Sequence, residues 1–325
     1  MTALWDTTGA EVLRKLSAER RHGGVASGLA FTLVVVVDER QVPLVEEAVT
    51  VAGSAHPGRL LVVTRRTGPV SPYPDRLDAE IVVGGRLGGY EAVIMRMQGR
   101  LALHAESVVI PLLAPDVPVV TWWHCVPPRR ISTDPLGVVA ERRITDVAQD
   151  SDPVAALHQR AVDYAAGDTD LAWTRLTRWR TLVAAALDQP AATAHVTAAA
   201  VTAPPDDASA ALMAGWLQTR LSVMPERRDA PAGSLESVRL ELAGGAEVAV
   251  SRRDGAVVVE RAGHQARTLP LLTPSPGELI AEELRRVGAD RPYAAALSAA
   301  TGVSGLDLRP ATRVHTWMDP EEVEV

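Results

Sequence analysis

The sequence predicts a protein of the α/β class with a mostly parallel sheet, and three observations lead to that class. A β-branched apolar run at 28–37 precedes an amphipathic segment at 41–55 and a second apolar run at 60–64. This β-α-β order predicts two parallel strands joined by a right-handed crossover helix. Later in the chain the pattern changes to short alternating segments joined by Gly-rich turns, which is typical of antiparallel hairpins. We therefore expect a Rossmann-like domain with helices over 1–190 and a smaller α+β domain over 191–325.

Caps, apolar periodicity and strand-like runs predict the elements of the first domain. Thr8 and Glu11 have the spacing of a capping box, which predicts a helix from Gly9 to about Arg21. Asp152 before Pro153 predicts another helix start. Further helices are expected at 41–55, 101–113, 153–166 and from Thr177 until Asp188, and strands at 28–37, 60–64, 79–83, 91–98, 119–123 and 142–147.

The second domain is expected to combine hairpins with two helices. Asp254-Gly255 is a hairpin turn signal between two alternating segments. The expected strands are 195–201, 235–242, 247–252 and 256–261, and the expected helices are 208–221 and 278–287. The acidic tail from Asp319 to Val325 is expected to fray.

Composition excludes several classes of function. Lys and Arg total 33 and Asp and Glu total 40, so the net charge is −7, which argues against general nucleic-acid binding. Cys125 is the single cysteine, so an intrachain disulfide and a Cys-rich zinc site are excluded. The longest apolar run falls short of the roughly 20 residues that a membrane span needs. With no basic and apolar leader at its start, the chain reads as a cytoplasmic, soluble protein.

No pattern supports a catalytic, cofactor or metal site. Gly84 to Gly89 follows a strand but precedes no helix pattern, so it lacks the order of a phosphate loop. The eight histidines show no ligand spacing. His124 lies beside Cys125, but adjacency does not bring two side chains together, and a lone cysteine is more often a small buried apolar residue. We predict a non-catalytic protein without cofactor or metal.

Tryptophan and arginine concentrate in a few stretches. Aromatic residues form 4% of the chain, yet Trp122-Trp123 is a doublet and Trp173 and Trp179 alternate with arginines between Asp170 and Arg180. Indole and guanidinium groups dominate binding hot spots, so these stretches could line a protein-binding surface or an anion pocket at the loop after 119–123, the carboxyl end of a strand. The alternative is structural, with tryptophans plugging a core and Arg142 or Arg143 pairing with Asp146 or Asp170.

Several of these stretches resemble one known family. Residues 111–118 leading into Trp122-Trp123, then 141–146 and 170–180, are similar in order to the OpcA-type glucose-6-phosphate dehydrogenase assembly proteins. His56-Pro-Gly-Arg59 and 214–221 also resemble that family. This chain departs from the pattern at Ala172, Arg178 and His124. The resemblance implies a cytoplasmic protein that promotes assembly or activity of the dehydrogenase that opens the oxidative pentose phosphate pathway.

Two functional hypotheses follow. The first is a non-catalytic factor that binds glucose-6-phosphate dehydrogenase and promotes its active oligomer. The second is a sugar-phosphate-binding sensor or enzyme that uses an Arg/Trp cleft at the carboxyl edge of the sheet. We interpret Trp179 as structural and favour Trp173 and Arg175 for function. The candidate partner-binding or anion-binding residues are His56, Arg59, Trp122, Trp123, Arg142, Arg143, Asp146, Asp170, Trp173, Arg175 and Arg180.

Overall fold

The chain forms two compact units. The computed structural model describes residues 1–23, 28–53, 57–66, 74–83, 90–187, 195–231, 233–286 and 288–309. Among these, the first unit contains residues 1–145 and 276–289, and the second contains 146–275 and 290–309. Residues 146–187, which we expected in the first domain, belong to the second unit, because Val147, Trp173 and Trp179 share its buried apolar cluster.

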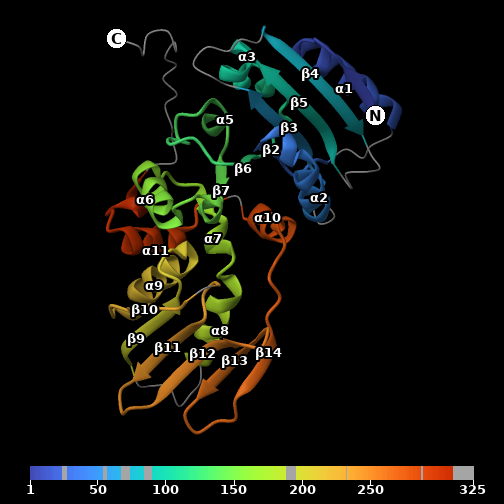
Figure 1. Cartoon of the computed structure of the whole chain (residues 1–325). Coiled ribbons are helices and arrows are strands. Elements are labelled where there is room, and N and C mark those ends of the chain that lie inside the picture. Colours follow the sequence, from blue (N-terminus) through green and yellow to red (C-terminus); the bar gives the residue numbers. More distant parts are fainter. Residues whose placement is uncertain are drawn as a thin grey trace, which may run out of the picture. The chain divides into compact units, whose positions relative to one another are not determined.

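The first unit is built on a mostly parallel sheet, which confirms the predicted fold class (Figure 1). Within this unit the strand order is β1-β4-β5-β3-β2-β6-β7. Strands β5, β3, β2, β6 and β7 are parallel to one another, β4 pairs antiparallel with β5, and β1 pairs antiparallel with β4. The strands are β1 (Thr2–Leu4), β2 (Thr32–Val37), β3 (Arg59–Arg66), β4 (Arg76–Val83), β5 (Glu91–Gln98), β6 (Val119–His124) and β7 (Arg142–Thr145).

Helices cover both faces of this sheet. The crossover from β2 to β3 runs in the opposite direction along the sheet from the crossover between β5 and β6, so right-handed connections place them on opposite faces. One face packs α1 (Gly9–Gly23), α3 (Arg100–Leu103), α4 (Ala105–Val109) and α5 (Pro135–Val138) in a single apolar cluster. The other carries α2 (Val42–Gly53), which packs against α10 (Pro276–Leu284).

Local chemistry explains where the elements of the first unit begin and end. Thr8 Oγ1 accepts a hydrogen bond from the Glu11 backbone N–H at 3.3 Å, so Thr8 caps the helix as expected, and the Glu11 carboxylate accepts from the Thr7 hydroxyl at 2.8 Å. The helix expected at 101–113 is broken at His104 into α3 and α4, with the 3-10 turn η2 (Ile110–Leu112) before the next strand. Strand β1 was not expected, because three residues are too short for a periodic signal.

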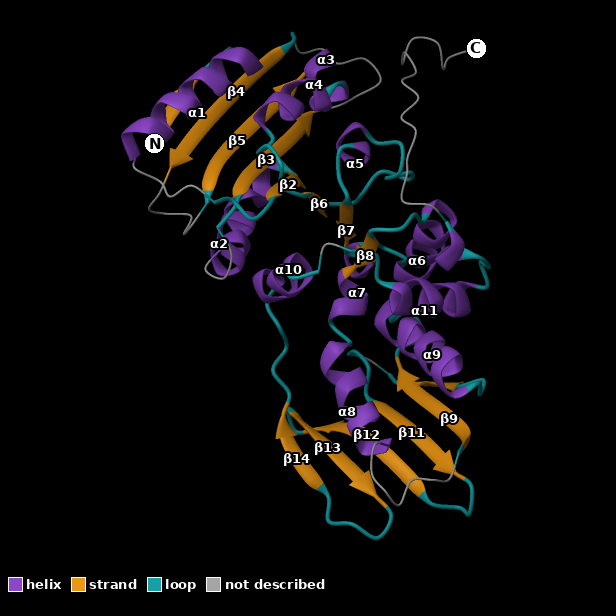
Figure 2. Ribbon diagram, turned by 180° about the vertical axis from the view of Figure 1, so that it is seen from behind, coloured by secondary structure: helices purple, strands orange, loops and turns teal. Residues whose placement is uncertain are grey.

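The second unit places helices on one face of a six-stranded sheet of order β10-β9-β11-β12-β13-β14 (Figure 2). Strand β10 is parallel to β9, and the other neighbours are antiparallel. The strands are β9 (Val196–Ala203), β10 (Glu226–Asp229), β11 (Ser237–Leu242), β12 (Glu247–Arg253), β13 (Ala256–Arg261) and β14 (Arg267–Pro270). The helices and short elements are η3 (Val147–Gln149), α6 (Pro153–Asp163), β8 (Asp168–Asp170), α7 (Leu171–Thr174), α8 (Thr177–Leu187), α9 (Ala208–Leu221), α11 (Arg291–Thr301) and η4 (Leu306–Leu308).

Most of the long elements of this unit were predicted. The helix expected at 208–221 is α9, and the three alternating segments form β11, β12 and β13. Strands β10 and β14, which are exposed along most of their length, and the Ala-rich helix α11 were not expected. The expectations for 54–56, 68–73, 84–89, 188–190, 287 and the acidic tail lie outside the described residues. No helix in the described part of the chain is long and apolar enough to cross a bilayer.

Helices α9 and α11 cross closely at Gly215. A Cβ atom at this position would lie 2.2 Å from the Ala296 carbonyl oxygen and 2.9 Å from the Ala300 nitrogen. Both atoms belong to the backbone of α11, so only a shift of the whole helix could make room. The absence of a side chain at Gly215 therefore allows the two helices to share a buried surface.

Gly215→Ala is expected to lower the free energy of unfolding by about 1–3 kcal/mol, because the cost of overpacking exceeds the gain in helix propensity. Gly9→Ala is the matched control. It makes the same change at the start of α1, where the nearest neighbour of the new Cβ is Val108 Cγ1 at 3.6 Å. Urea denaturation measures both variants, and equal stability of the two would contradict the close crossing.

Candidate functional site

The stretch 170–180 begins with a buried carboxylate that organises the backbone. Asp170 is the N-cap of α7, and its Oδ1 accepts a hydrogen bond from the Ala172 N–H at 2.8 Å. Its Oδ2 accepts a second bond, from the Val147 N–H at 3.0 Å. Asp170 is 0% exposed. A buried carboxylate is stable only when its oxygens accept such bonds, so Asp170 ties the start of η3 to the start of α7.

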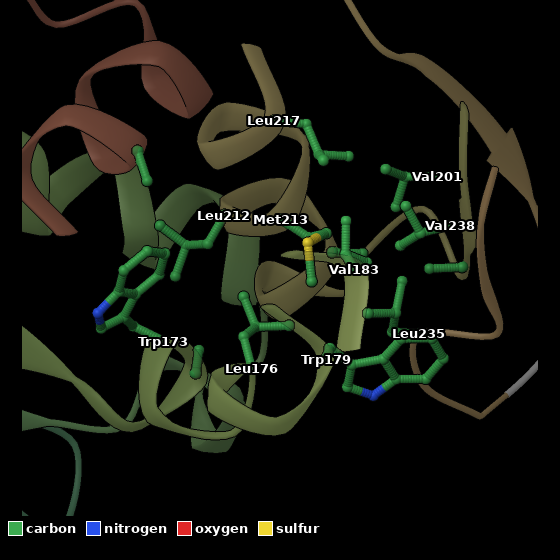
Figure 3. Close-up of a cluster of buried hydrophobic side chains, with 14 of the residues drawn as sticks. Trp173, Leu176, Trp179, Val183, Val201, Leu212, Met213, Leu217, Leu235 and Val238 are labelled. Carbon is green, nitrogen blue, oxygen red and sulfur yellow. The ribbon is translucent and has the colours of Figure 1, made fainter. Parts of the chain in front are cut away.

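Trp173 is a core residue with three specific neighbours. Its indole N–H donates to Asp290 Oδ2 at 2.9 Å. The guanidinium carbon of Arg180 lies 3.4 Å from the ring centroid, and the Tyr293 ring lies at 5.9 Å. Trp173 is 1% exposed. Figure 3 shows it beside Leu176 and Leu212 in the same cluster as Trp179.

Arg175 forms a two-pronged ion pair with Asp146. Its Nη1 and Nη2 donate to the two carboxylate oxygens, both at 2.7 Å. Burial works to lower the pKa of Arg175, and the hydrogen bonds and charge of Asp146 outweigh it, so the pKa is raised. The Arg175 side chain is 31% exposed, and the carboxylate is buried. Arg175 thus pairs with a buried carboxylate while its own side chain remains partly exposed at the surface.

The candidates on β6 and β7 are also buried. Trp122 and Trp123 are adjacent on a strand and point to opposite faces of the sheet, with 0% exposure each. Trp123 joins the apolar cluster under α5, and the Trp122 ring lies 4.8 Å from the ring of His124. Buried indoles present no surface to a partner.

Arg142 and Arg143 are adjacent on β7, so their side chains point to opposite faces of the sheet. Arg142 pairs with Glu283 of α10 and donates to the Gly288 carbonyl oxygen at 2.8 Å. Arg143 donates to the Ala140 carbonyl oxygen beside α5. Both are 1% exposed. These arginines hold segments of the first unit together, which agrees with the structural interpretation of the motif, although the ion-pair partner of Arg142 is Glu283 rather than an aspartate.

Arg59 is the first residue of β3, a central strand of the sheet, where it lies between Thr32 of β2 and Glu91 of β5. It donates to the Leu112 carbonyl oxygen at 2.8 Å and to Glu91 Oε2 at 3.0 Å. It is 3% exposed and therefore also structural. His56, its predicted neighbour in the site, lies outside the described residues.

A pocket of about 350 Å³ lies at the carboxyl ends of β2 and β3, where the sequence interpretation placed no site. Its lining residues are Asp38, Glu39, Arg40, Thr64, Arg65 and Arg66. Ligands of open α/β sheets bind beyond the carboxyl ends of the parallel strands, and the sequence interpretation considered only the loop after β6 for such a site. The signal was present in the sequence, because both apolar runs end directly in charged residues. The described residues contain no group of three or more His, Cys, Asp or Glu placed to hold a metal ion.

Cys125 directly follows β6, and its thiol is a weaker acid than an ordinary cysteine thiol. Its Sγ lies 3.6 Å from the Val36 carbonyl oxygen. Burial raises the pKa of the Cys125 thiol to about 11, the charges of Asp38 and Asp134 add to the shift, and Arg65 opposes it. Because the thiolate is the reactive form, this environment disfavours thiol chemistry at neutral pH.

The fold and these contacts define a two-unit α/β protein in which the motif residues Trp122, Trp123, Trp173, Arg59, Arg142 and Arg143 are buried. The profile of the glucose-6-phosphate dehydrogenase subunit N-terminal domain matches residues 49–162. The profile of the C-terminal domain of the same subunit matches residues 166–297. The chain therefore belongs to the OpcA family of glucose-6-phosphate dehydrogenase assembly subunits, which confirms the resemblance. No curated protein matches the chain.

Trp173→Ala is expected to lower the free energy of unfolding by about 3–5 kcal/mol, because it leaves a cavity and removes the bond to Asp290. Trp5→Ala makes the same change at a side chain that is 65% exposed and should cost less than about 0.5 kcal/mol. Thermal and urea melts compare the two. A Trp173→Ala protein as stable as Trp5→Ala would show that Trp173 does not support the core.

The folded chain is expected to react slowly with iodoacetamide at pH 8. A pKa of about 11 instead of 9.0 leaves roughly 100-fold less thiolate. The rate should rise about tenfold per pH unit until the pKa is reached, whereas the urea-unfolded chain should react like an ordinary thiol. Equal rates for folded and unfolded chains would contradict the shift.

Proposed function

We propose that this chain binds glucose-6-phosphate dehydrogenase in the cytoplasm and promotes formation of its active oligomer, without catalysing a reaction itself. The observation that carries the proposal is the pair of consecutive family matches, to the N-terminal and C-terminal domains of the dehydrogenase subunit. Together they extend over 49–297, which includes most of both compact units. The functional assignment thus concerns the whole fold rather than one motif.

The contacts of the family-like stretches support a scaffold role. Arg142 is buried and neutralised by Glu283, so it is committed to a partner within the chain. Arg175 pairs with Asp146, but its side chain stays 31% exposed. Among the candidates, Arg175 retains a partly exposed side chain, and we propose it as a contact for the dehydrogenase.

Adding the purified chain to glucose-6-phosphate dehydrogenase is expected to raise the specific activity and to yield a larger complex. Initial rates of NADPH formation and size exclusion with light scattering measure the two effects. Bovine serum albumin at equal concentration controls for non-specific protection of the enzyme. No complex and no change in rate or oligomer mass would overturn the proposal.

Arg175→Gln is expected to lower this activation several-fold, because it removes a charged group that reaches the surface. Arg252→Gln makes the same change at an exposed arginine of β12 and should leave activation within about twofold, as expected of a side chain outside the contact. Because Arg175→Gln also unpairs the buried Asp146, both variants are assayed well below their melting temperatures. Equal activation by both folded variants would place the dehydrogenase contact elsewhere.

A further inference from the structure

The edge of the first sheet at β1 differs in chemistry from the edges of the second sheet at β10 and β14. Each of these strands stands at an end of its sheet order. Strand β10 consists of charged residues, and β14 contains Arg267 and ends at Pro270. Charges and proline on an edge strand discourage pairing with another chain. Residues 1–5, Met-Thr-Ala-Leu-Trp, contain neither, so the edge at β1 lacks this protection.

An exposed apolar surface lies beside this edge. The Thr2 hydroxyl donates to Glu19 of α1 at 2.9 Å, and Leu4 packs against the apolar cluster that includes α1, so both side chains point toward that helix. Side chains alternate along an extended strand, which places positions 1, 3 and 5 on the opposite side. Met1 is 81% exposed and Trp5 is 65% exposed. Exposed aromatic side chains of this kind are typical hot spots of protein association.

The edge is complementary to itself in the antiparallel orientation. When two copies of β1 pair about a twofold axis at Ala3, which is exposed, this residue faces its own copy. Met1 then lies opposite Trp5, and Thr2 lies opposite Leu4 on the α1 side. The contact between a thioether sulfur and an aromatic ring is favourable. Apolar contacts therefore fill both ends of the pairing, as an isologous interface requires.

The charges next to the edge are complementary as well. Lys15 and Glu19 of α1 form an ion pair at 3.1 Å, with side chains that are 40% and 31% exposed. Glu19 lies beside β1, because it accepts the Thr2 hydroxyl. A twofold axis reverses the order of the two charges, so the lysine of one copy can face the glutamate of the other. Opposite charges brought together in this way favour a second copy as the partner.

We propose that two copies of this chain associate by antiparallel pairing of β1, with Trp5 of each copy packed on Met1 of the other. An aromatic side chain buries about 150–250 Å², so two tryptophans and a short strand pair give an interface below about 1,200 Å², at the low end for specific association. The dimer is therefore expected to be weak. Residues 1–5 precede both family matches, the first of which begins at residue 49, and the proposal does not depend on the assembly function.

Sedimentation velocity on the full chain, from about 5 to 500 µM, tests the association over the range of a weak interface. The weight-average mass is expected to rise from the 34.6 kDa of one chain toward twice that value. Trp5→Ala should raise the dissociation constant about tenfold or more, because it removes the largest buried side chain of the interface. Met224→Ala, at a side chain that is 77% exposed, is the matched control and should change it less than about twofold.

Ala3→Glu tests the position of the twofold axis. It places two carboxylates opposite each other in the pair, and like charges directly opposite are destabilising, so no dimer is expected at about 500 µM. Ala184→Glu makes the same change at an exposed position of α8 and should leave the dimer intact. Melting curves check the fold of every variant, and Trp5→Ala tests the interface by itself if Ala3→Glu does not fold.

Ala3→Cys tests the strand register directly. Opposite Cα atoms of an antiparallel pair lie about 4.5–5.5 Å apart, which is within the range of a disulfide. Oxidised glutathione is expected to link the Ala3→Cys chains into a covalent dimer that a reducing agent separates. The wild-type chain, whose Cys125 thiol has a pKa of about 11, and the Ala184→Cys control should stay unlinked.

Three results would overturn the proposal. The first is a wild-type chain that remains monomeric over the whole concentration range. If Trp5→Ala then lowers activation of the dehydrogenase, the surface around Trp5 belongs to that enzyme rather than to a second copy. The second is a dimer that Trp5→Ala and Ala3→Glu weaken no more than their controls do. The third is a failure of the Ala3→Cys chains to become linked.

Discussion

Buried charge must be paired, and this constraint organises the part of the chain that first suggests a binding site. Asp170 is fully buried and accepts backbone hydrogen bonds from η3 and α7. Arg175 is held by Asp146 a few residues along, and Arg180 stacks on Trp173. Removing Arg175 would leave the buried Asp146 carboxylate without its ion-pair partner, which costs several kcal/mol. The stretch therefore behaves as one structural unit, and its strong sequence signature reflects that interdependence.

The same constraint separates two kinds of arginine in the first unit. Arg59 and Arg142 are buried, and each pairs with a glutamate that neutralises it. Arg40 stands at the rim of a pocket with its guanidinium open to solvent. The charges of Arg59 and Arg142 are neutralised within the fold, whereas Arg40 remains exposed to solvent. Counting arginines in a sequence cannot separate the two kinds, because the difference lies in which carboxylate reaches them.

The burial of the candidate residues could be predicted in part from the sequence, for identifiable reasons. Helical periodicity placed Trp179 on a buried face correctly, since a helix begun at Thr177 fixes which side chains point inward. Trp173 has no such periodicity around it, because α7 is a single turn, so its burial could not be read from the pattern. Asp290 and Glu283, the partners of Trp173 and Arg142, are more than 100 residues away along the chain. Without the fold, no rule of spacing selects them from 40 acidic residues.

The sequence by itself determined the α/β class, most long helices and strands, the parallel order around β2 and β3, and the family resemblance. Those features depend on local periodicity, on caps and on residue order, all of which one chain contains. Only the tertiary structure decided which unit the segment 146–187 joins, because that depends on the apolar surface against which Trp173 and Trp179 pack. It also decided which charges are buried and which remain open, since that depends on contacts between segments distant in sequence.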